Sequence, residues 1–442
     1  FVQDEKTYNK NEFYTEELVQ VEVIGHLRNY RLAKITIHPF QYNPTENLLK
    51  VAKNIQLDVQ FKNADLQKTT QIQKKYNSLY FRGIGERIVN NSLQKSSDVI
   101  MSIPVKYVIV SDPMFRETLQ PFVEWKKQKG YIVIEAYTDD PAVGSTTTDI
   151  RAYLKSLYEN ATESNPAPTF GLLVGDIDQI PVFDGEAGYH VSDLYYFEYT
   201  NDYLPDVYYG RFSANTIAEL QPQIDKTLTY EQYALSDPAY LENAVLIAGV
   251  DASNAPTYGN GQISYGSTYY FNQEHNMNAY VYYYPESGSS RTAILENINN
   301  GVTFANYTAH CDAGGWADPS FSRNDVNNLT NFGKYGTLIG NCCQSGMFDV
   351  DVCFGEKLLR AENKGAVGYI GASNLSYWDE DYYFGVGVGP IKSNPTYDET
   401  DLGMYDRLFH DNGEIRNDWF TTNGQMLMAG NLAVTESNSS LI

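Results

Sequence analysis

Two short segments of the sequence each deliver a reactive side chain directly after an apolar run. The run at 337–339 leads through Gly and Asn to Cys342 and Cys343. The run at 301–307 leads to His310. Runs of this length are typical of buried parallel strands, and ligands bind at the carboxyl ends of such strands in open α/β sheets. Two neighbouring strands that end in these residues bring a thiol and an imidazole together, as a cysteine nucleophile and its base require.

The residue types assign three roles. We expect Cys343 to be the nucleophile and His310 to be the general base and acid. Asp251 follows a third apolar run, at 244–250, and is expected to orient the imidazole. Cys342 is the alternative nucleophile, because period-two alternation turns only one of the two cysteines towards a cleft. The structural alternatives are a buried cysteine, a hydrogen-bonded core histidine and a helix-capping aspartate.

Two neighbours of Cys343 are expected to lower the pKa of its thiol. One is a histidine in its charged form, and the other is the N-terminus of a helix, which the sequence predicts at 354–362. The backbone N–H groups of Cys311 and Cys343 are candidates for an oxyanion hole.

Asp381 lies among aromatic residues, which suits recognition of a lysine or arginine side chain. Aromatic walls hold the methylene groups, and the carboxylate meets the charge. The alternative is an exposed acidic turn. The aromatic residues are Tyr377, Trp378, Tyr382 and Tyr383.

Oxygen-bearing residues recur at spaced positions between 176 and 206, which suits a hard cation such as calcium. The spacing is not that of an EF-hand, so the residues alone favour a solvated acidic loop. The residues are Asp176, Asp178, Asp202 and Asp206, with Thr200 and Leu204 at alternate positions.

The cysteine and charge distributions limit the possible classes of protein. All 4 cysteines fall between Cys311 and Cys353, which favours a reactive thiol with buried neighbours over a disulfide framework or a zinc site. Residues 1–100 hold 14 Lys and Arg against 11 Asp and Glu, whereas the remainder holds 18 against 44. The net charge of −23 disfavours nucleic acid as a partner. No apolar run approaches the ~18 residues of a membrane span.

The elements that must position these residues follow two patterns. Alternation and β-branched residues predict strands at 18–24, 31–38 and 54–61, and the polar stretch 63–103 reads as a linker. From 104 onward, apolar strands alternate with amphipathic helices, which predicts an α/β fold with helices on both faces of parallel sheets. The length of 442 residues predicts two or three domains.

Residues 104–435 resemble the gingipains, a family of secreted cysteine endopeptidases, and most closely its lysine-specific members. The resemblance implies a caspase-like parallel sheet flanked by helices in two subdomains, preceded by a β-rich prodomain. It implies a propeptide at 1–80, a linker with a processing site at 81–103, for example Lys95, a calcium-binding subdomain at 104–236 and a Cys/His subdomain at 237–442. The segments that carry it are ANYTAHCDAGGWADPSF, LIGNCCQSGMFD, CFGEKL, GYIGASNLSYWDEDYYFGVG, DLYYFEYTNDYLPDVY and VLIAGVD.

The resemblance also implies residue roles. The second cysteine of its NCC motif is the nucleophile, which falls on Cys343, with His310 and Asp251 as partners. Asp381 matches the residue that receives the substrate lysine, and the pocket positions match Thr308, Asn341 and Trp378. The implied calcium ligands match Asp176, Thr200, Asp202, Leu204 and Asp206, and those of a second ion site match Phe348 and Glu356.

One position departs from the family pattern. The family has Gly directly after the catalytic histidine, and here the residue is Cys311. We expect this cysteine to place a second thiol beside the active site, where it can oxidise onto Cys343.

The sequence therefore predicts the zymogen form of a secreted endopeptidase that cleaves after lysine. Its partners are protein or peptide substrates with lysine at P1 and its own propeptide as inhibitor. Structural calcium is expected and an organic cofactor is not. The alternatives are the same fold with arginine or another P1 specificity, and an inactive binding or secretion module.

Overall fold

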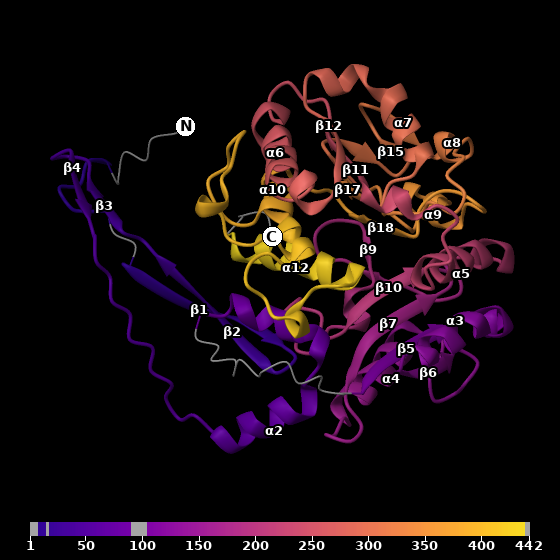
Figure 1. The fold of residues 1–442 in the computed structure, drawn as a ribbon. Coiled ribbons are helices and arrows are strands. Elements are labelled where there is room, and N and C mark those ends of the chain that lie inside the picture. The colour runs from indigo at the N-terminus through magenta and orange to yellow at the C-terminus, as the bar shows by residue number, and fades with distance from the viewer. Residues whose placement is uncertain (1–7, 15–16, 90–103, 438–442) are drawn as a thin grey trace. The chain divides into compact units, whose positions relative to one another are not determined.

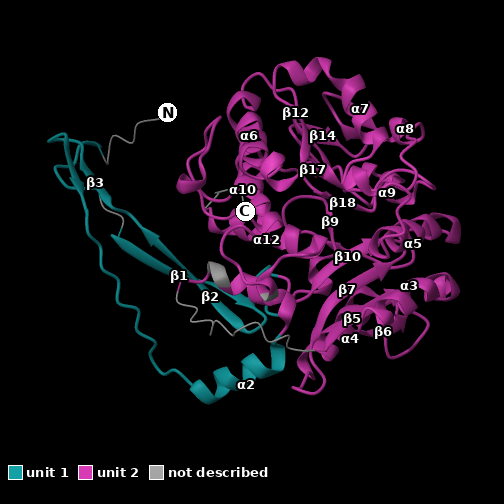
Figure 2. Ribbon diagram, in the orientation of Figure 1, with its two compact units in different colours: residues 1–77, 200–204 teal, residues 78–199, 205–442 magenta. Residues whose placement is uncertain are grey.

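The structure is a computed structural model, and it describes residues 8–14, 17–89 and 104–437. Lys95, the processing site suggested by the sequence, lies outside the described residues. The chain forms two compact units, which are described separately (Figure 2). Residues 1–77 and 200–204 form the smaller unit, and residues 78–199 and 205–442 form the larger one.

In the part of the smaller unit that the structure describes, two antiparallel strand pairs are followed by the helix α2. The pairs are β1 (Val19–Leu27) with β2 (Tyr30–Ile37) and β3 (Phe40–Asn43) with β4 (Leu48–Val51). The prediction of a strand at 54–61 was wrong, because no strand forms there. Part of the predicted linker is instead helical: α2 (Leu66–Tyr76) begins after Asp65, whose side chain accepts a hydrogen bond from the N–H of Lys68. No residue of α2 is buried, and its mostly polar composition is what led to the prediction of a linker.

The first sheet of the larger unit is parallel and confirms the predicted strand–helix alternation. Its strands lie in the order β10-β7-β5-β6. Helices α3 and α5 pack on one face through buried side chains such as Leu119 and Ile224, which contact Ile109 and Leu172. The elements are β5 (Val105–Ser111), α3 (Arg116–Gln128), β6 (Tyr131–Tyr137), α4 (Thr147–Glu159), β7 (Pro168–Val174), β10 (Tyr208–Phe212) and α5 (Ile217–Glu231), with a small pair β8 (Phe183–Asp184) and β9 (Val191–Ser192).

The second sheet is also parallel, with the strand order β12-β11-β13-β17-β18. Its strands are β11 (Asn243–Ala248), β12 (Asn278–Tyr282), β13 (Phe304–Thr308), β17 (Thr337–Asn341) and β18 (Gly368–Gly371). Its helices are α6 (Asn260–Tyr269), α7 (Arg291–Asn300), α8 (Arg323–Val326), α9 (Phe354–Arg360), α10 (Trp378–Val386), α11 (Met404–Phe409) and α12 (Asn423–Glu436). A small antiparallel sheet is formed by β14 (Cys311–Asp312), β15 (Gly315–Trp316) and β16 (Phe321–Ser322).

Both faces of the second sheet are buried, which explains why its strands read as continuous apolar runs. Successive residues of β11 enter different cores: Val245 and Ile247 pack on the side of α7 and α9, whereas Leu246 packs on the side of α6 and α10. Figure 1 shows these helix pairs on opposite sides of the sheet. The strand ends are therefore held rigidly, and their carboxyl edge is the place where side chains can leave the core.

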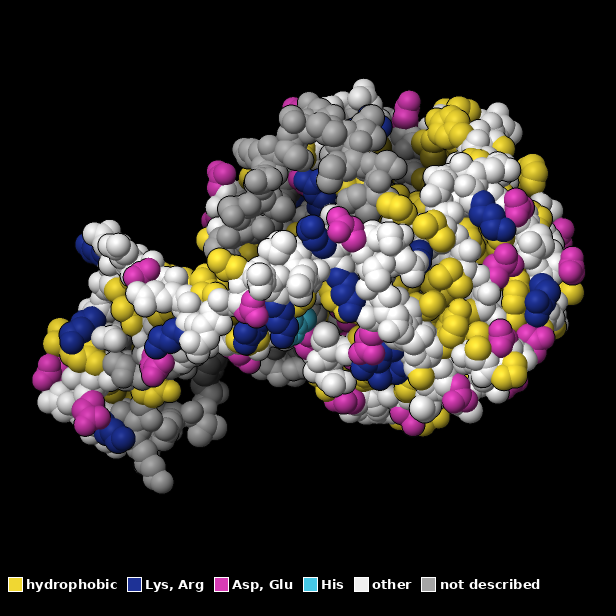
Figure 3. Space-filling view, turned by 90° about the horizontal axis from the view of Figure 1, so that it is seen from below, with side chains coloured by type: hydrophobic (Ala, Val, Ile, Leu, Met, Phe, Trp, Pro, Cys, Tyr) yellow, Lys and Arg dark blue, Asp and Glu magenta, His cyan; other side chains and the backbone are white. Residues whose placement is uncertain are grey.

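The surface of the larger unit carries charges of both signs. On the face seen in Figure 3, acidic and basic side chains are interspersed with apolar ones and do not gather in one patch. Within the described residues, no helix has the length and apolar character needed to cross a membrane.

Candidate active site

The three residues predicted to do chemistry follow three neighbouring strands of the second sheet. Strand β13 lies between β11 and β17. In this register Thr308 pairs with Ala248 on one side and with Asn341 on the other. The strands thus end at the same level, and Asp251, His310 and Cys343 follow shortly after at one sheet edge.

His310 and Asp251 form a hydrogen-bonded pair. The distance between His310 Nε2 and Asp251 Oδ2 is 2.8 Å. The His310 side chain is 56% exposed, whereas that of Asp251 is only 15% exposed. The imidazole also stands edge-on to the Trp378 ring, with ring centroids 5.7 Å apart. The hydrogen bond to Asp251 and the contact with the Trp378 ring fix the orientation of the His310 imidazole, which still reaches solvent.

The loop after β11 keeps Asp251 ionised. Its carboxylate accepts hydrogen bonds from the backbone N–H groups of Ser253 and Asn254, at 2.8 and 2.9 Å. Desolvation acts to raise the pKa of Asp251, but the hydrogen bonds from Asn254, His310 and Ser253 outweigh it and lower the pKa to about 2. Asp251 is therefore charged at neutral pH.

The cysteines are arranged differently from the prediction. Cys311 and Cys342 form a disulfide, so the expectation of a free Cys311 thiol beside Cys343 was wrong. The parallel register explains the bond, because it brings the residues that follow β13 and β17 to a Cα–Cα distance of 5.3 Å. Cys343 and Cys353 are the free cysteines.

The adjacent residues Cys342 and Cys343 differ in bonding and in exposure. Cys342 is 1% exposed and belongs to the core, whereas Cys343 is partly exposed and its thiol lies 3.5 Å from the carbonyl oxygen of Ser376. Cys353 is buried, and desolvation together with the nearby Glu356 raises the pKa of its thiol to about 12. Cys343 is thus the accessible thiol among the described residues.

The predicted helix is separated from Cys343 along the chain by an irregular segment. Helix α9 begins at Phe354, and turns occupy the intervening segment. Gln344 adopts a left-handed conformation with φ of 57°, which turns the chain sharply after Cys343.

Asp381 lies in the first turn of α10 and is 7% exposed, which excludes the alternative of an exposed acidic turn. The hydroxyl of Ser376 donates a hydrogen bond to Asp381 Oδ2 at 3.0 Å. Burial is the main cause that raises the pKa of Asp381 to about 8, and the neighbouring Glu380 and Asp379 add to it. Among the described residues, no basic side chain forms an ion pair with Asp381.

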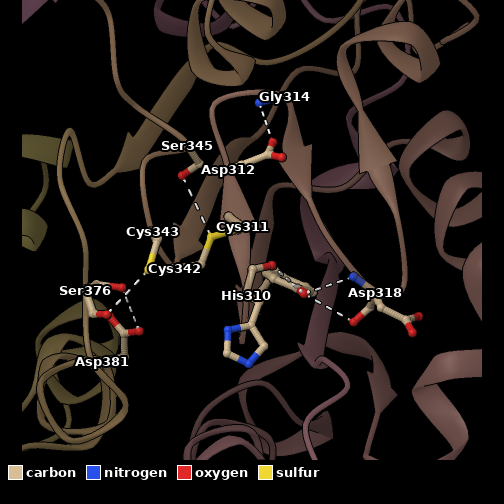
Figure 4. The surroundings of a disulfide bond; sticks show 11 residues. His310, Cys311, Asp312, Gly314, Asp318, Cys342, Cys343, Ser345, Ser376 and Asp381 are labelled. Atoms are coloured by element: carbon tan, nitrogen blue, oxygen red, sulfur yellow. Dashed lines mark hydrogen bonds between the residues drawn. A yellow bond between two sulfur atoms is a disulfide. The ribbon is translucent and has the colours of Figure 1, made fainter.

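The structure connects Asp381 to Cys343 through Ser376, to which the sequence assigned no role. Ser376 contacts both, with its carbonyl at the thiol and its hydroxyl at the carboxylate (Figure 4). Asn341 donates a hydrogen bond to the Asp381 carbonyl at 2.9 Å, and the buried Gln262 donates a second one. No sequence signal pointed to Gln262, because it reaches Asp381 across 119 positions of the chain.

The remaining predicted pocket residues adjoin this group. Thr308 is 1% exposed at the end of β13, and Trp378 begins α10, with its ring between those of His310 and Tyr258. Cys311 begins β14 and pairs with Trp316 in the small antiparallel sheet. The role of the Cys311 and Cys343 N–H groups as oxyanion donors stays a prediction.

The predicted calcium ligands of the larger unit have protein partners. Asp176 Oδ2 receives hydrogen bonds from Arg360 at 2.7 Å and from Asn215 at 2.6 Å. The carboxylate of Asp206 accepts hydrogen bonds from the Tyr158 hydroxyl at 3.0 Å and the Tyr199 N–H at 3.1 Å. These carboxylates suit calcium in their chemistry, but an arginine already neutralises one of them.

The other predicted ion ligands are similarly engaged. In the smaller unit, Asp202 accepts hydrogen bonds from the Thr200 hydroxyl and the Leu204 N–H, at 2.7 and 3.1 Å. Glu356 binds Arg360 and the Ser213 hydroxyl, each at 2.6 Å, and Phe348 lies under the Arg211 guanidinium. The described residues contain no group of three or more His, Cys, Asp or Glu side chains placed to hold a metal ion. Calcium binding stays a prediction.

Two family sequence models match the chain. The model of peptidase family C25 matches residues 101–441, and the model of the C25 propeptide matches residues 1–84. The chain is 39% identical over 441 residues to Lys-gingipain of Porphyromonas gingivalis, which covers 99% of this chain. It spans about a quarter of the length of that relative, 25%.

Solved structures agree with the sequence comparison. A structure described as a protease is 40% identical, covers 76% of this chain and 73% of its own, and superimposes with a TM-score of 0.71. The Arg-specific cysteine proteinase gingipain R is 25% identical, covers 78% of this chain and 75% of its own, and has a TM-score of 0.63. The α/β fold with parallel sheets flanked by helices is therefore the one these structures share.

Proposed function

This chain belongs to peptidase family C25, and from that premise we propose that it is a cysteine endopeptidase that hydrolyses peptide bonds after lysine. The observation that supports the proposal most strongly is the arrangement at one sheet edge. Cys343, with a free and partly exposed thiol, follows the strand next to that of His310, whose imidazole pairs with Asp251, and Ser376 links the thiol to the buried carboxylate of Asp381. The proposed nucleophile, base and specificity residue thus come from one edge of one sheet.

The reaction uses His310 through the nitrogen that Asp251 does not engage. Because Nε2 is bound to Asp251, Nδ1 takes the thiol proton, and the Cys343 thiolate bonds to the scissile carbonyl carbon. The C–N bond breaks as His310 returns the proton to the leaving amine. Water, deprotonated by His310, then hydrolyses the thioester and restores the thiol. The N–H groups of Cys311 and Cys343 are the proposed donors to the oxyanion.

The lysine preference rests on Asp381. The carboxylate of Asp381 is buried and has no cationic partner among the described residues, so its charged form carries a free-energy cost of desolvation. A substrate ammonium group that enters the pocket stabilises this charge. Trp378 offers an aromatic wall for the lysine methylenes. The 39% identity to Lys-gingipain supports lysine over other residues.

Arginine at P1 is the second candidate. The same carboxylate also accepts a guanidinium group, and the Arg-specific gingipain R shares the fold. The identity to that protein is 25%, lower than to Lys-gingipain, which is why we place arginine second.

The N-terminal residues that match the C25 propeptide are the proposed inhibitor of the same chain. Secretion is proposed as well, and the Cys311–Cys342 disulfide supports it, since disulfides persist in oxidising compartments. Structural calcium remains part of the proposal because carboxylate and carbonyl oxygens are the ligands it prefers.

The test is turnover of matched lysyl and arginyl fluorogenic peptides by protein cut between propeptide and catalytic region, with a mild thiol present. We expect lysyl turnover that Cys343→Ala abolishes and that Cys353→Ala, at the other free cysteine, retains. If the protein cleaved the arginyl peptide faster than the lysyl peptide, arginine would replace lysine as the proposed P1 residue. No turnover of either peptide would contradict the peptidase function and favour a binding module.

A further inference from the structure

The Cys311–Cys342 disulfide joins the two segments that carry the proposed catalytic pair. It bridges residues 31 positions apart, and each half is the direct chain neighbour of a reactive residue: Cys311 of His310, and Cys342 of Cys343. Figure 4 shows His310 and Cys343 beside this bond. The strands beneath are already paired through Thr308 and Asn341, so the disulfide adds a covalent link just beyond the last ladder position.

Each side of the disulfide is anchored in the fold. On one side, the carbonyl of His310 accepts hydrogen bonds from the Tyr307 hydroxyl and the Ala317 N–H, both at 3.0 Å. On the other side, Cys342 lies in the core at 1% exposure. The imidazole itself, in contrast, is more than half exposed and is held by one hydrogen bond to Asp251. Its position relative to the thiol therefore depends on the backbone that the disulfide fixes.

We propose that the Cys311–Cys342 disulfide is a positioning brace that holds His310 at its working distance from Cys343, so that the active form has an oxidised brace and a reduced nucleophile. The inference rests on the proposed peptidase function. The proposal predicts that thiol reagents have two opposite effects on activity. Mild monothiols keep Cys343 reduced and support activity, whereas a strong dithiol opens the brace and lowers it.

Opening the brace is a two-electron reduction by a dithiol. A reagent thiolate attacks the sulfur of Cys311, the more exposed partner, and forms a mixed disulfide while Cys342 leaves as a thiolate and takes a proton. The second thiol of the reagent then closes the reagent's own disulfide and releases Cys311 as a thiol. Cys342 must leave as a thiolate although it is buried. We therefore expect reduction of the disulfide to be slower than reactions at the Cys343 thiol.

The variants are Cys311→Ala with Cys342→Ala, which removes the bond without leaving an unpaired thiol, and Cys353→Ala as the matched control outside the bond. We expect the double variant to lose about tenfold or more in kcat with KM changed less than about twofold, because small misplacements of catalytic groups are costly. Cys353→Ala should keep both constants. Unchanged kcat in the folded double variant would overturn the proposal.

A second readout separates positioning from mere stability. A thiol paired with imidazolium reacts with iodoacetamide well below the pH at which a free thiol, with a pKa of about 8.5, reacts. We expect Cys343 to be alkylated more slowly across the pH profile in the double variant than in the wild type and Cys353→Ala, because the imidazole is no longer held at the thiol. Coinciding profiles would contradict a positioning role even if the variant were less stable.

The wild type covers the case in which the double variant does not fold. Graded dithiothreitol, with the fraction of Cys311–Cys342 disulfide read by mass spectrometry, should lower kcat in proportion to the opened fraction. Full activity with the disulfide open would overturn the brace, as would absence of the disulfide in active protein. If the wild type cleaves neither peptide, the peptidase function fails, and the alkylation profiles alone decide whether the brace positions His310.

Discussion

Two buried carboxylates of the larger unit, Asp176 and Asp381, differ in the partner that compensates their burial. Asp176 follows a strand of the first sheet and forms an ion pair with Arg360, in which both side chains are 6% exposed. Asp381 lies beyond the last strand of the second sheet and receives a hydroxyl hydrogen bond from Ser376. The described residues supply it with no cation.

The difference shows how similar strand–helix units serve structure at one place and recognition at another. A buried charge that is paired within the protein has its burial compensated without a substrate. A buried carboxylate without a cation retains its desolvation cost, which appears as the raised pKa of Asp381. A substrate lysine supplies the cation that the protein lacks there.

The largest expected effect is that of Asp381→Asn on lysyl turnover. Loss of the charge should lower kcat/KM by roughly two orders of magnitude or more, because one partner of a buried charge pair is removed. Asp379→Asn, in the same helical turn, should change it little. Steady-state kinetics on lysyl peptides measures both, and an unchanged kcat/KM in Asp381→Asn would show that this carboxylate does not read the P1 residue.

The same substitution sharpens the comparison through its pH dependence. The folded pKa of about 8 lies above the ordinary value of 3.8, so the folded state retains a proton that the unfolded state releases. The stability that Asp381 contributes is complete below 3.8 and is lost as the pH rises through 8. Asp381→Asn should therefore raise Tm relative to the wild type more at pH 8 than at pH 5. If the Tm of the wild type and that of Asp381→Asn changed with pH in parallel, the burial of Asp381 without a cation would be contradicted.

Arg360→Ala is expected to lower stability and leave turnover nearly unchanged, whereas Asp381→Asn lowers turnover. Arg360→Ala leaves Asp176 and Glu356 buried without their cation and should lower the free energy of unfolding by about 3 kcal/mol or more, while the kcat of the folded molecules stays close to that of the wild type. Urea unfolding and active-site titration measure the two quantities. Lys357→Ala in the same helix is the control. Equal stability in Arg360→Ala would mean that this pair is not structural.

Asp251→Asn should have a smaller effect, about tenfold on kcat, because it orients His310 without touching the substrate. The pKa of about 2 lies below the ordinary 3.8, so the stability that Asp251 contributes is present above 3.8 and is lost as the pH falls through 2. The pH–rate profile above pH 4 should accordingly show no limb from Asp251. Such a limb, or full activity in Asp251→Asn, would argue against the pairing with His310.

Calcium is expected to have the smallest effect. If it binds the folded state as the sequence predicts, saturating calcium should raise Tm by roughly 2–5 °C over protein in a chelator. Magnesium at the same ionic strength is the control. An identical Tm in all three solutions would show that the ion pair of Asp176 with Arg360 leaves no role for the cation.

The sequence was informative where chemistry follows rigid strands. Continuous apolar runs predicted β11, β13 and β17, and their parallel order places Asp251, His310 and Cys343 at one edge. Local periodicity could not give the register between β13 and β17, and the disulfide depends on that register. The choice between Cys342 and Cys343 was open for the same reason.

Contacts from distant segments were also beyond the sequence. Gln262 reaches Asp381 only after α6 and α10 have packed on the sheet, and it stands in no recognisable pattern. Arg360 likewise meets Asp176 across 184 positions, so the sequence could not indicate this ion pair. Such partners follow from tertiary packing and leave no periodic signal.

The most direct test of the central claim is covalent labelling with a lysyl chloromethyl ketone, followed by peptide mapping, on protein cut between propeptide and catalytic region. We predict a single modified residue, Cys343, with labelling faster than by the arginyl reagent and strongly slowed in Asp381→Asn. Modification of Cys353, or labelling that Asp381→Asn does not slow, would contradict the assignment of nucleophile and pocket.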